Sequence, residues 1–173
     1  MNKRLVLVVL CVFACCSLAQ AQTASGTLNV SGTIQGSISL VFDNDVAGPS
    51  LTGAGSSTAT LPFGTVGVGV TPGTGVTITP GTGNYTVSAP FDVKVSLANS
   101  SSANFKLQAQ LANPDATNTW TIAGNTVTSA SQVTTIATGT YGSDVSQTLS
   151  VQIPNSSTAT SISNQINFVA TAN

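Results

Sequence analysis

The chain has 173 residues, of which only 5% are charged, and its formal net charge is −1. Typical soluble domains carry about 25% charged residues, so Ser, Thr, Asn, Gln and Gly must build most of this surface. The sequence contains no histidine and no glutamate, which excludes a Ser-His-Asp triad, the usual zinc sites and a Glu general acid. We therefore expect no catalytic residues, no cofactor and no metal, and a protein that is not an enzyme.

Residues 1–21 are predicted to be an export signal. Two basic residues precede an apolar run over residues 5–14, and small residues follow as far as an Ala-Gln-Ala pattern that ends at Ala21. The apolar run is too short to cross a bilayer, which needs about 20 residues. We therefore expect cleavage after Ala21 and one exported domain over residues 22–173, with no membrane span.

All three cysteines, Cys11, Cys15 and Cys16, lie inside this predicted signal. The exported domain then has no disulfide, no thiol nucleophile and no thiolate ligand. Lipid attachment at Cys15 or Cys16 is the alternative, but Phe13 is bulky where a lipoprotein signal usually has a small residue. Cleavage also removes two of the four basic residues, which leaves two lysines against five aspartates, a net charge of 2 − 5 = −3. Such a domain has no basic surface for nucleic acid.

In the exported part, apolar and polar residues alternate from the start, which is the pattern of half-buried strands. From Leu28 to Phe42 the even positions read Leu, Val, Gly, Ile, Gly, Ile, Leu and Phe. Because this run exceeds the usual strand of about 5–6 residues, we expect two strands, or one strand that changes sheet near Gly36.

A loop is predicted at residues 43–60, where Asp, Asn, Gly, Ser and Thr gather. Residues 61–66 (Leu-Pro-Phe-Gly-Thr-Val) are predicted to be an edge strand, because an edge tolerates the internal proline. Residues 67–83 are rich in Gly, Pro and Thr and hold only a short apolar alternation. Tyr85 to Leu97 follow as the clearest strand of the chain.

More strands are predicted towards the C-terminus, and a tight hairpin at Ala123-Gly124-Asn125-Thr126 leads into Val127. These strands are expected around residues 105–111, 120–122, 133–136, 145–153 and 162–172. Counting all segments gives about eight or nine short strands separated by turns, and no helical periodicity. This spacing is typical of a β-sandwich or barrel.

Two local patterns suggest binding sites. Asp43-Asn44-Asp45 offers oxygen ligands of the kind that calcium prefers, but no glutamate completes an EF-hand loop, and such residues also form turns. Trp120 alternates with Ile122 and Tyr85 with Val87, so both rings are expected to face the core. Tyr141, in a Gly-Thr-Tyr-Gly loop, is the one aromatic expected to be exposed for stacking on a sugar.

Sheet edges are usually protected by charges, above all by lysine. Lys94 and Lys106 are the only lysines of the predicted domain. Such a protein either covers its edges or pairs through them, and an alternating segment near the exported N-terminus suits strand addition to a neighbour. The alternative is that this segment is an ordinary first strand of its own domain.

The order of segments resembles the major subunits of bacterial chaperone–usher fimbriae, in particular the disulfide-free class of colonisation-factor pilins. The matching pieces are TLNVSGTIQGSISLVF, FDVKVSLAN, NTWTIAGNTV, SQTLSVQIPN and INFVATAN. The resemblance implies an immunoglobulin-like β-sandwich that lacks one strand. In that family a periplasmic chaperone fills the gap first, and the N-terminal extension of the next subunit replaces it.

Carried over to this chain, the resemblance implies that Leu28, Val30, Gly32 and Ile34 are the donor-strand positions, with Gly32 where a side chain would not fit. The sequence thus predicts an all-β, immunoglobulin-like β-sandwich of about eight or nine strands. Its expected role is that of an exported structural or adhesive surface protein, a fimbrial subunit that assembles by donor-strand exchange. Its expected partners are further copies of itself and a periplasmic chaperone, in the bacterial periplasm, at the cell surface or in a fimbrium. The alternative is a secreted monomeric module that binds carbohydrate or another ligand.

Overall fold

The computed structural model describes residues 27–32, 36–130 and 134–173. It divides the chain into two compact units, residues 1–33 and 34–173. In the first unit, residues 27–32 form no strand, so the expectation of a strand at this point is wrong for these residues. An extended segment becomes a strand only when a neighbour pairs with its backbone. The predicted export signal lies outside the described residues.

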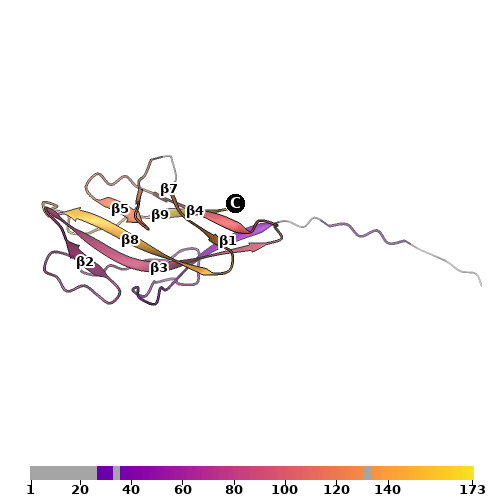
Figure 1. Cartoon of the computed structure of the whole chain (residues 1–173), viewed down its shortest axis with the longest axis horizontal. Coiled ribbons are helices and arrows are strands. Elements are labelled where there is room, and N and C mark those ends of the chain that lie inside the picture. The colour runs from indigo at the N-terminus through magenta and orange to yellow at the C-terminus, as the bar shows by residue number, and fades with distance from the viewer. Residues whose placement is uncertain (1–26, 33–35, 131–133) are drawn as a thin grey trace, which may run out of the picture. The chain divides into compact units, whose positions relative to one another are not determined.

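The second unit is all-β, as predicted, and its described residues contain no helix (Figure 1). In the described part of the chain, nine strands follow one another. They are β1 (Ser37–Asp43), β2 (Thr77–Pro80), β3 (Asn84–Ala98), β4 (Asn104–Leu111), β5 (Thr119–Ile122), β6 (Asn125–Val127), β7 (Thr134–Thr140), β8 (Asp144–Pro154) and β9 (Ile166–Ala172).

The strands form two antiparallel sheets. The larger sheet has six strands in the order β1-β3-β8-β5-β6, with β2 also paired to β3, and the smaller sheet has the order β7-β4-β9. β1 pairs with one half of β3, from Asp92 to Ala98, and β2 with the other half, from Tyr85 to Ser88. The two-sheet architecture confirms the prediction of an all-β sandwich.

The core lies where the alternating side chains of both sheets meet. Val87, Ala89, Val93 and Val95 of β3 have no exposed surface and Phe91 is also buried, while the polar residues and the proline between them are half-buried. β4 and β8 repeat the pattern, and Trp120 of β5 is buried as predicted. Period-two alternation places every second side chain on one face, so these sequences fold as strands that share one apolar layer.

The predicted hairpin between β5 and β6 is confirmed. Its two turn residues are Ala123, with φ of 49°, and Gly124, with φ of 79°. Positive φ at both central residues is the geometry of a type I′ turn, which matches the twist of the two flanking strands. Glycine adopts this conformation freely, whereas alanine is strained there.

A long excursion, residues 44–76, separates β1 from β2. Glycines allow its two ends to meet, because a Cβ on Gly75 would lie 2.2 Å from the carbonyl carbon of Gly48, and a Cβ on Gly48 would lie 2.2 Å from the carbonyl oxygen of Pro90. The edge strand predicted at residues 61–66 is not formed. Within the described part of the chain, no backbone hydrogen bond joins these six residues to a neighbouring strand. The apolar pattern was present, but the pairing partner was not.

Candidate functional site

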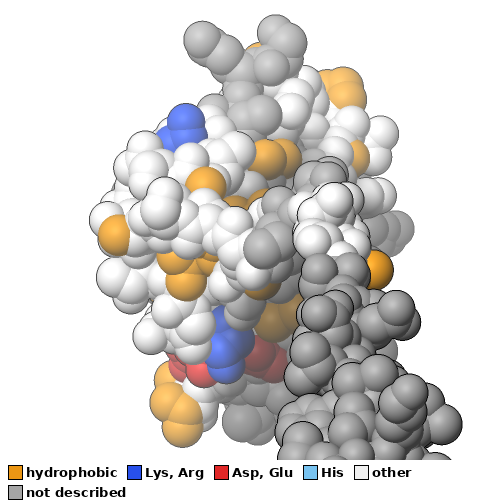
Figure 2. All heavy atoms as spheres, turned by 90° about the vertical axis from the view of Figure 1, so that its right-hand side faces the viewer, with side chains coloured by type: hydrophobic (Ala, Val, Ile, Leu, Met, Phe, Trp, Pro, Cys, Tyr) orange, Lys and Arg blue, Asp and Glu red, His pale blue; other side chains and the backbone are white. Residues whose placement is uncertain are grey.

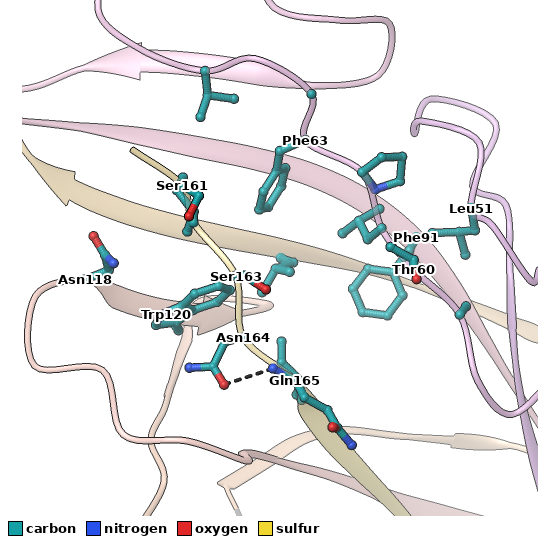
Figure 3. Close-up of a pocket in the computed structure, with 18 of the residues that line it drawn as sticks. Leu51, Thr60, Phe63, Phe91, Asn118, Trp120, Ser161, Ser163, Asn164 and Gln165 are labelled. Carbon is teal, nitrogen blue, oxygen red and sulfur yellow. Dashed lines mark hydrogen bonds between the residues drawn. The ribbon is translucent and has the colours of Figure 1, made fainter. Parts of the chain in front are cut away.

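The second unit has a large groove between its two sheets, with a volume of about 1560 Å³. One wall is formed by β1 and residues 57–66 of the excursion, and the other by residues 157–168, which include the start of β9. Figure 3 shows Phe63 pointing into this space from one side, while Ser161 and Ser163 lie on the other. The groove therefore runs along the boundary between the large and the small sheet.

The floor of the groove is apolar and belongs to the shared core. It is formed by Phe91, Trp120, Leu149 and Ile153. Their exposed fractions are only 5, 4, 7 and 4% respectively. The floor residues are thus almost completely covered by neighbouring side chains.

β9 presents an unpaired edge to this groove. It pairs with β4 from Leu111 to Phe105, and no other strand among the described residues pairs with it. Its inward-facing residues Ile166, Phe168 and Ala170 remain only half-buried. A free row of backbone N–H and C=O groups beside half-buried apolar side chains can accept one more strand.

Three phenylalanines connect the two sheets where β1 and β9 approach one another. The ring of Phe42 lies 5.1 Å from Phe168 and 6.3 Å from Phe91, and Phe91 lies 5.9 Å from Phe168. Contacts of this kind between tilted or edge-on rings are favourable in cores. These rings line the groove and form part of its apolar surface.

Asp115 fixes the position of Trp120 in the floor. Its carboxylate accepts hydrogen bonds from the Trp120 indole N–H at 2.8 Å, from the Asn118 backbone and side chain at 2.9 Å each, and from the Thr117 N–H at 3.0 Å. Burial raises the pKa of Asp115, but these hydrogen bonds outweigh it and lower the pKa to about 2. The carboxylate is therefore ionised and holds the indole in place.

Asp43 is the last residue of β1, and Asn44 and Asp45 lead into the turn that follows. The Asn44 side-chain oxygen accepts the Leu51 N–H at 2.7 Å, and the Asp45 carboxylate accepts the Ala47 N–H at 2.7 Å and the Ser146 hydroxyl at 2.5 Å. The Ser146 and Ala47 hydrogen bonds lower the pKa of Asp45. Among the described residues, no group of three or more metal-ligating side chains comes together.

Charged side chains gather at the same end of the large sheet. Lys94 pairs with Asp144 at 3.3 Å, and Asp92 lies opposite Ser146. Burial, followed by repulsion from Asp45 and Asp144, raises the pKa of Asp92. In Figure 2 most of the visible surface is uncharged, and basic and acidic side chains meet in one small cluster.

Tyr141 is not the exposed ring that the sequence suggested. It is half-buried, its ring lies 5.7 Å from that of Phe105, and its hydroxyl donates to the Asn104 carbonyl at 2.7 Å. The glycine-flanked loop predicted exposure because Phe105, which packs against the ring, is distant in the sequence. Tyr85 is half-buried and lines the groove, and Trp120 lies in its floor. The three rings do not form an open sugar-stacking platform.

The candidate donor positions lie in or next to the first unit. Leu28 and Val30 are each 87% exposed, Gly32 has no atom within 4 Å of an added Cβ, and Ile34 falls outside the described residues. Sequence reasoning missed the groove walls at residues 57–60 and 157–161, because they lie in loops whose composition carries no pairing signal. Residues 162–165 were expected to begin a strand, but β9 starts only at Ile166. The strands predicted at residues 61–66 and 162–172 were the features that marked this region.

The described residues contain no helix with the length and apolar character needed to span a membrane. Comparisons of the chain with protein-family models, with curated proteins and with solved structures each find no match.

Proposed function

We propose that this chain is an exported structural or adhesive surface protein that assembles by accepting an extended strand from a second copy of itself, and that it has no catalytic role. The donated segment is residues 28–34, and the acceptor is the groove along β9. The observation that carries this proposal is the unpaired edge of β9 beside an apolar groove of about 1560 Å³.

Strand addition would stabilise both the acceptor and the donor. The incoming backbone would complete the hydrogen bonds of β9, and alternate side chains would turn towards the groove. Leu28 and Val30 are large apolar residues that are 87% exposed. Burying each such side chain contributes roughly 1.5–3 kcal/mol. Gly32, two residues further on, adds no side chain.

The strand order supports an immunoglobulin-like fold that lacks its last strand. Immunoglobulin constant-type sandwiches have strands A, B, E and D in one sheet and C, F and G in the other. The order β1-β3-β8-β5 corresponds to A-B-E-D, and the pair β4-β9 corresponds to C-F. The place of G, beyond β9, holds no strand of the described residues. This correspondence agrees with the resemblance to fimbrial subunits.

The proposal implies a bacterial location in the periplasm, at the cell surface or in a fimbrium. Its main partner is a second copy of the chain, and a periplasmic chaperone is a further partner that could occupy the same groove before assembly. Exposed apolar residues that alternate at the end of an exported chain are consistent with such a donor.

The test compares two double variants of the chain from Gln22 onward. Leu28→Asp with Val30→Asp places charges on the apolar positions of the donor, whereas Asn29→Asp with Ser31→Asp adds the same charge to the intervening polar positions. We expect the wild type and the polar-position variant to form oligomers or filaments in size-exclusion chromatography and electron microscopy. The apolar-position variant should stay monomeric, with an unchanged β-type circular dichroism spectrum.

A wild-type chain that is monomeric at all concentrations, and that binds no synthetic peptide of residues 23–34, would refute the proposal. Loss of assembly in both double variants would also count against it, because charge alone would then explain the effect.

A further inference from the structure

The buried floor of the groove requires a cover. Phe91, Trp120 and Ile153 are at most 5% exposed, although no strand of the described residues occupies the groove beside β9. Apolar floors that are open to water are unfavourable and rare in soluble domains. Other groups along the groove must therefore shield these residues.

Residues 61–66 of the excursion provide this shield, and we refer to them as the cover. Leu61, Phe63 and Val66 are half-buried, pack against the core and line the groove. Figure 3 shows the Phe63 side chain reaching from its loop into the pocket. Pro62 and Gly64, between them, are exposed. The segment that was predicted to be an edge strand thus places apolar side chains over the floor.

The cover is held at its ends and by its side chains. On one side Thr60 exchanges two backbone hydrogen bonds with Thr52, at 2.8 and 3.1 Å, and on the other the Val70 N–H donates to the Gly67 carbonyl at 3.3 Å. Between these points, across the part of the chain that the structure describes, residues 61–66 form no backbone hydrogen bond. A contact of this kind is replaceable, because its removal breaks no backbone pairing.

We propose that the cover shields the groove before assembly and gives way when residues 28–34 of a second copy enter, an inference that rests on the proposed function. Through Leu28 and Val30, the incoming segment makes apolar contacts with the floor in place of those that the cover makes. It also pairs with the edge of β9, which the cover does not. The cover therefore keeps the floor out of water while the groove is empty, and the exchange proceeds because the strand adds hydrogen bonds.

The test measures the binding of a fluorescent synthetic peptide of residues 23–34 to the chain from Gln22 onward, by anisotropy. A cover that must be displaced competes with the peptide, so Phe63→Ser should bind the peptide about tenfold more tightly than the wild type. In the absence of peptide, the same variant should bind more of the hydrophobic dye ANS. Tighter binding cannot result from a failure to fold, since a misfolded acceptor binds less.

A second comparison uses a milder variant of the cover and a control variant outside it. Val66→Ser weakens the cover by one smaller side chain, and the peptide should bind it about threefold more tightly. Val46→Ser makes the same chemical change at a fully exposed position of the same excursion. Peptide affinity and dye binding of this control should match the wild type.

If the wild type binds the peptide but Phe63→Ser and Val66→Ser bind it equally or more weakly, residues 61–66 are a fixed wall of the groove and the inference is wrong, while the proposed function stands. If neither the wild type nor the variants bind the peptide, residues 28–34 are not the occupant, and the proposed function and the exchange both fail.

Discussion

β3 and β9 have similar alternating sequences, but among the described residues β3 has neighbouring strands on both sides and β9 on one side only. β3 is flanked by β8 on one side and by β1 and β2 on the other, and its inward residues from Val87 to Val95 are at most 5% exposed. β9 is flanked by β4 alone within the described residues, and Ile166 and Phe168 stay half-buried. Burial of an apolar face therefore depends on the number of neighbouring strands as well as on the pattern itself.

The same contrast separates residues 61–66 from the paired strands. Their side chains pack on the core, but their backbone groups have no partner among the described residues. Side-chain burial and backbone pairing, which coincide in β3, are thus separated along the groove. An incoming strand would restore both, which is why the groove is the part of the molecule suited to assembly.

The largest expected effect is the loss of free energy of unfolding when a leucine in a paired strand is truncated, compared with a leucine in the unpaired cover. Leu107→Ala, in β4 between two neighbouring strands, removes a side chain with no exposed surface and should lower the free energy of unfolding by about 3 kcal/mol. Leu61→Ala, in the half-buried cover, should lower it by less than about 1 kcal/mol. Urea unfolding followed by the fluorescence of Trp120 measures both. Equal losses would mean that the groove side is packed as tightly as the core.

A smaller effect concerns the support of the groove floor. Asp115→Ala leaves the Trp120 indole N–H and two backbone N–H groups without their acceptor and should lower the free energy of unfolding by about 2 kcal/mol. Asp144→Ala is the control, because its ion pair with Lys94 is partly exposed and should contribute less than about 0.5 kcal/mol.

The pH dependence of Asp115 follows from its lowered pKa. Because the folded-state pKa of about 2 lies below the ordinary value of 3.8, the ionised group stabilises the fold fully above about pH 5. This contribution is lost as the pH falls from about 5 towards 2. Urea midpoints measured across this range should fall less steeply in Asp115→Ala than in the wild type. Parallel curves would contradict the assigned role of Asp115.

The smallest expected effect is a gain in the free energy of unfolding, at the turn between β5 and β6. Ala123→Asn should raise the free energy of unfolding by about 0.5–1 kcal/mol, because asparagine tolerates the positive φ of this turn better than alanine. Asn99, at φ of 56°, already has this residue type at a comparable position. Ala116→Asn, at an exposed position without a positive φ, should leave thermal unfolding unchanged. A loss of stability in Ala123→Asn would show that the turn selects for something other than its backbone angles.

Several elements were predictable because their signals are local. The alternation from Tyr85 to Leu97 predicted β3 within one residue at each end, and Ala123-Gly124 predicted the hairpin between β5 and β6. The burial of Trp120 followed from its register with Ile122. The predictions failed at residues 27–32, at residues 61–66 and at Tyr141. In each case the outcome depended on contacts with residues that are distant in the sequence.

The sequence by itself determined the class of the fold and the scarcity of ionisable chemistry, because period-two alternation and composition are properties of neighbouring residues. Only the tertiary structure decided which alternating segments found partners. β3 found neighbours on both sides, β9 on one side and residues 61–66 on neither, among the residues that the structure describes. Pairing depends on chain segments that are far apart in sequence, so an open edge beside an apolar groove emerges only when the two sheets are assembled.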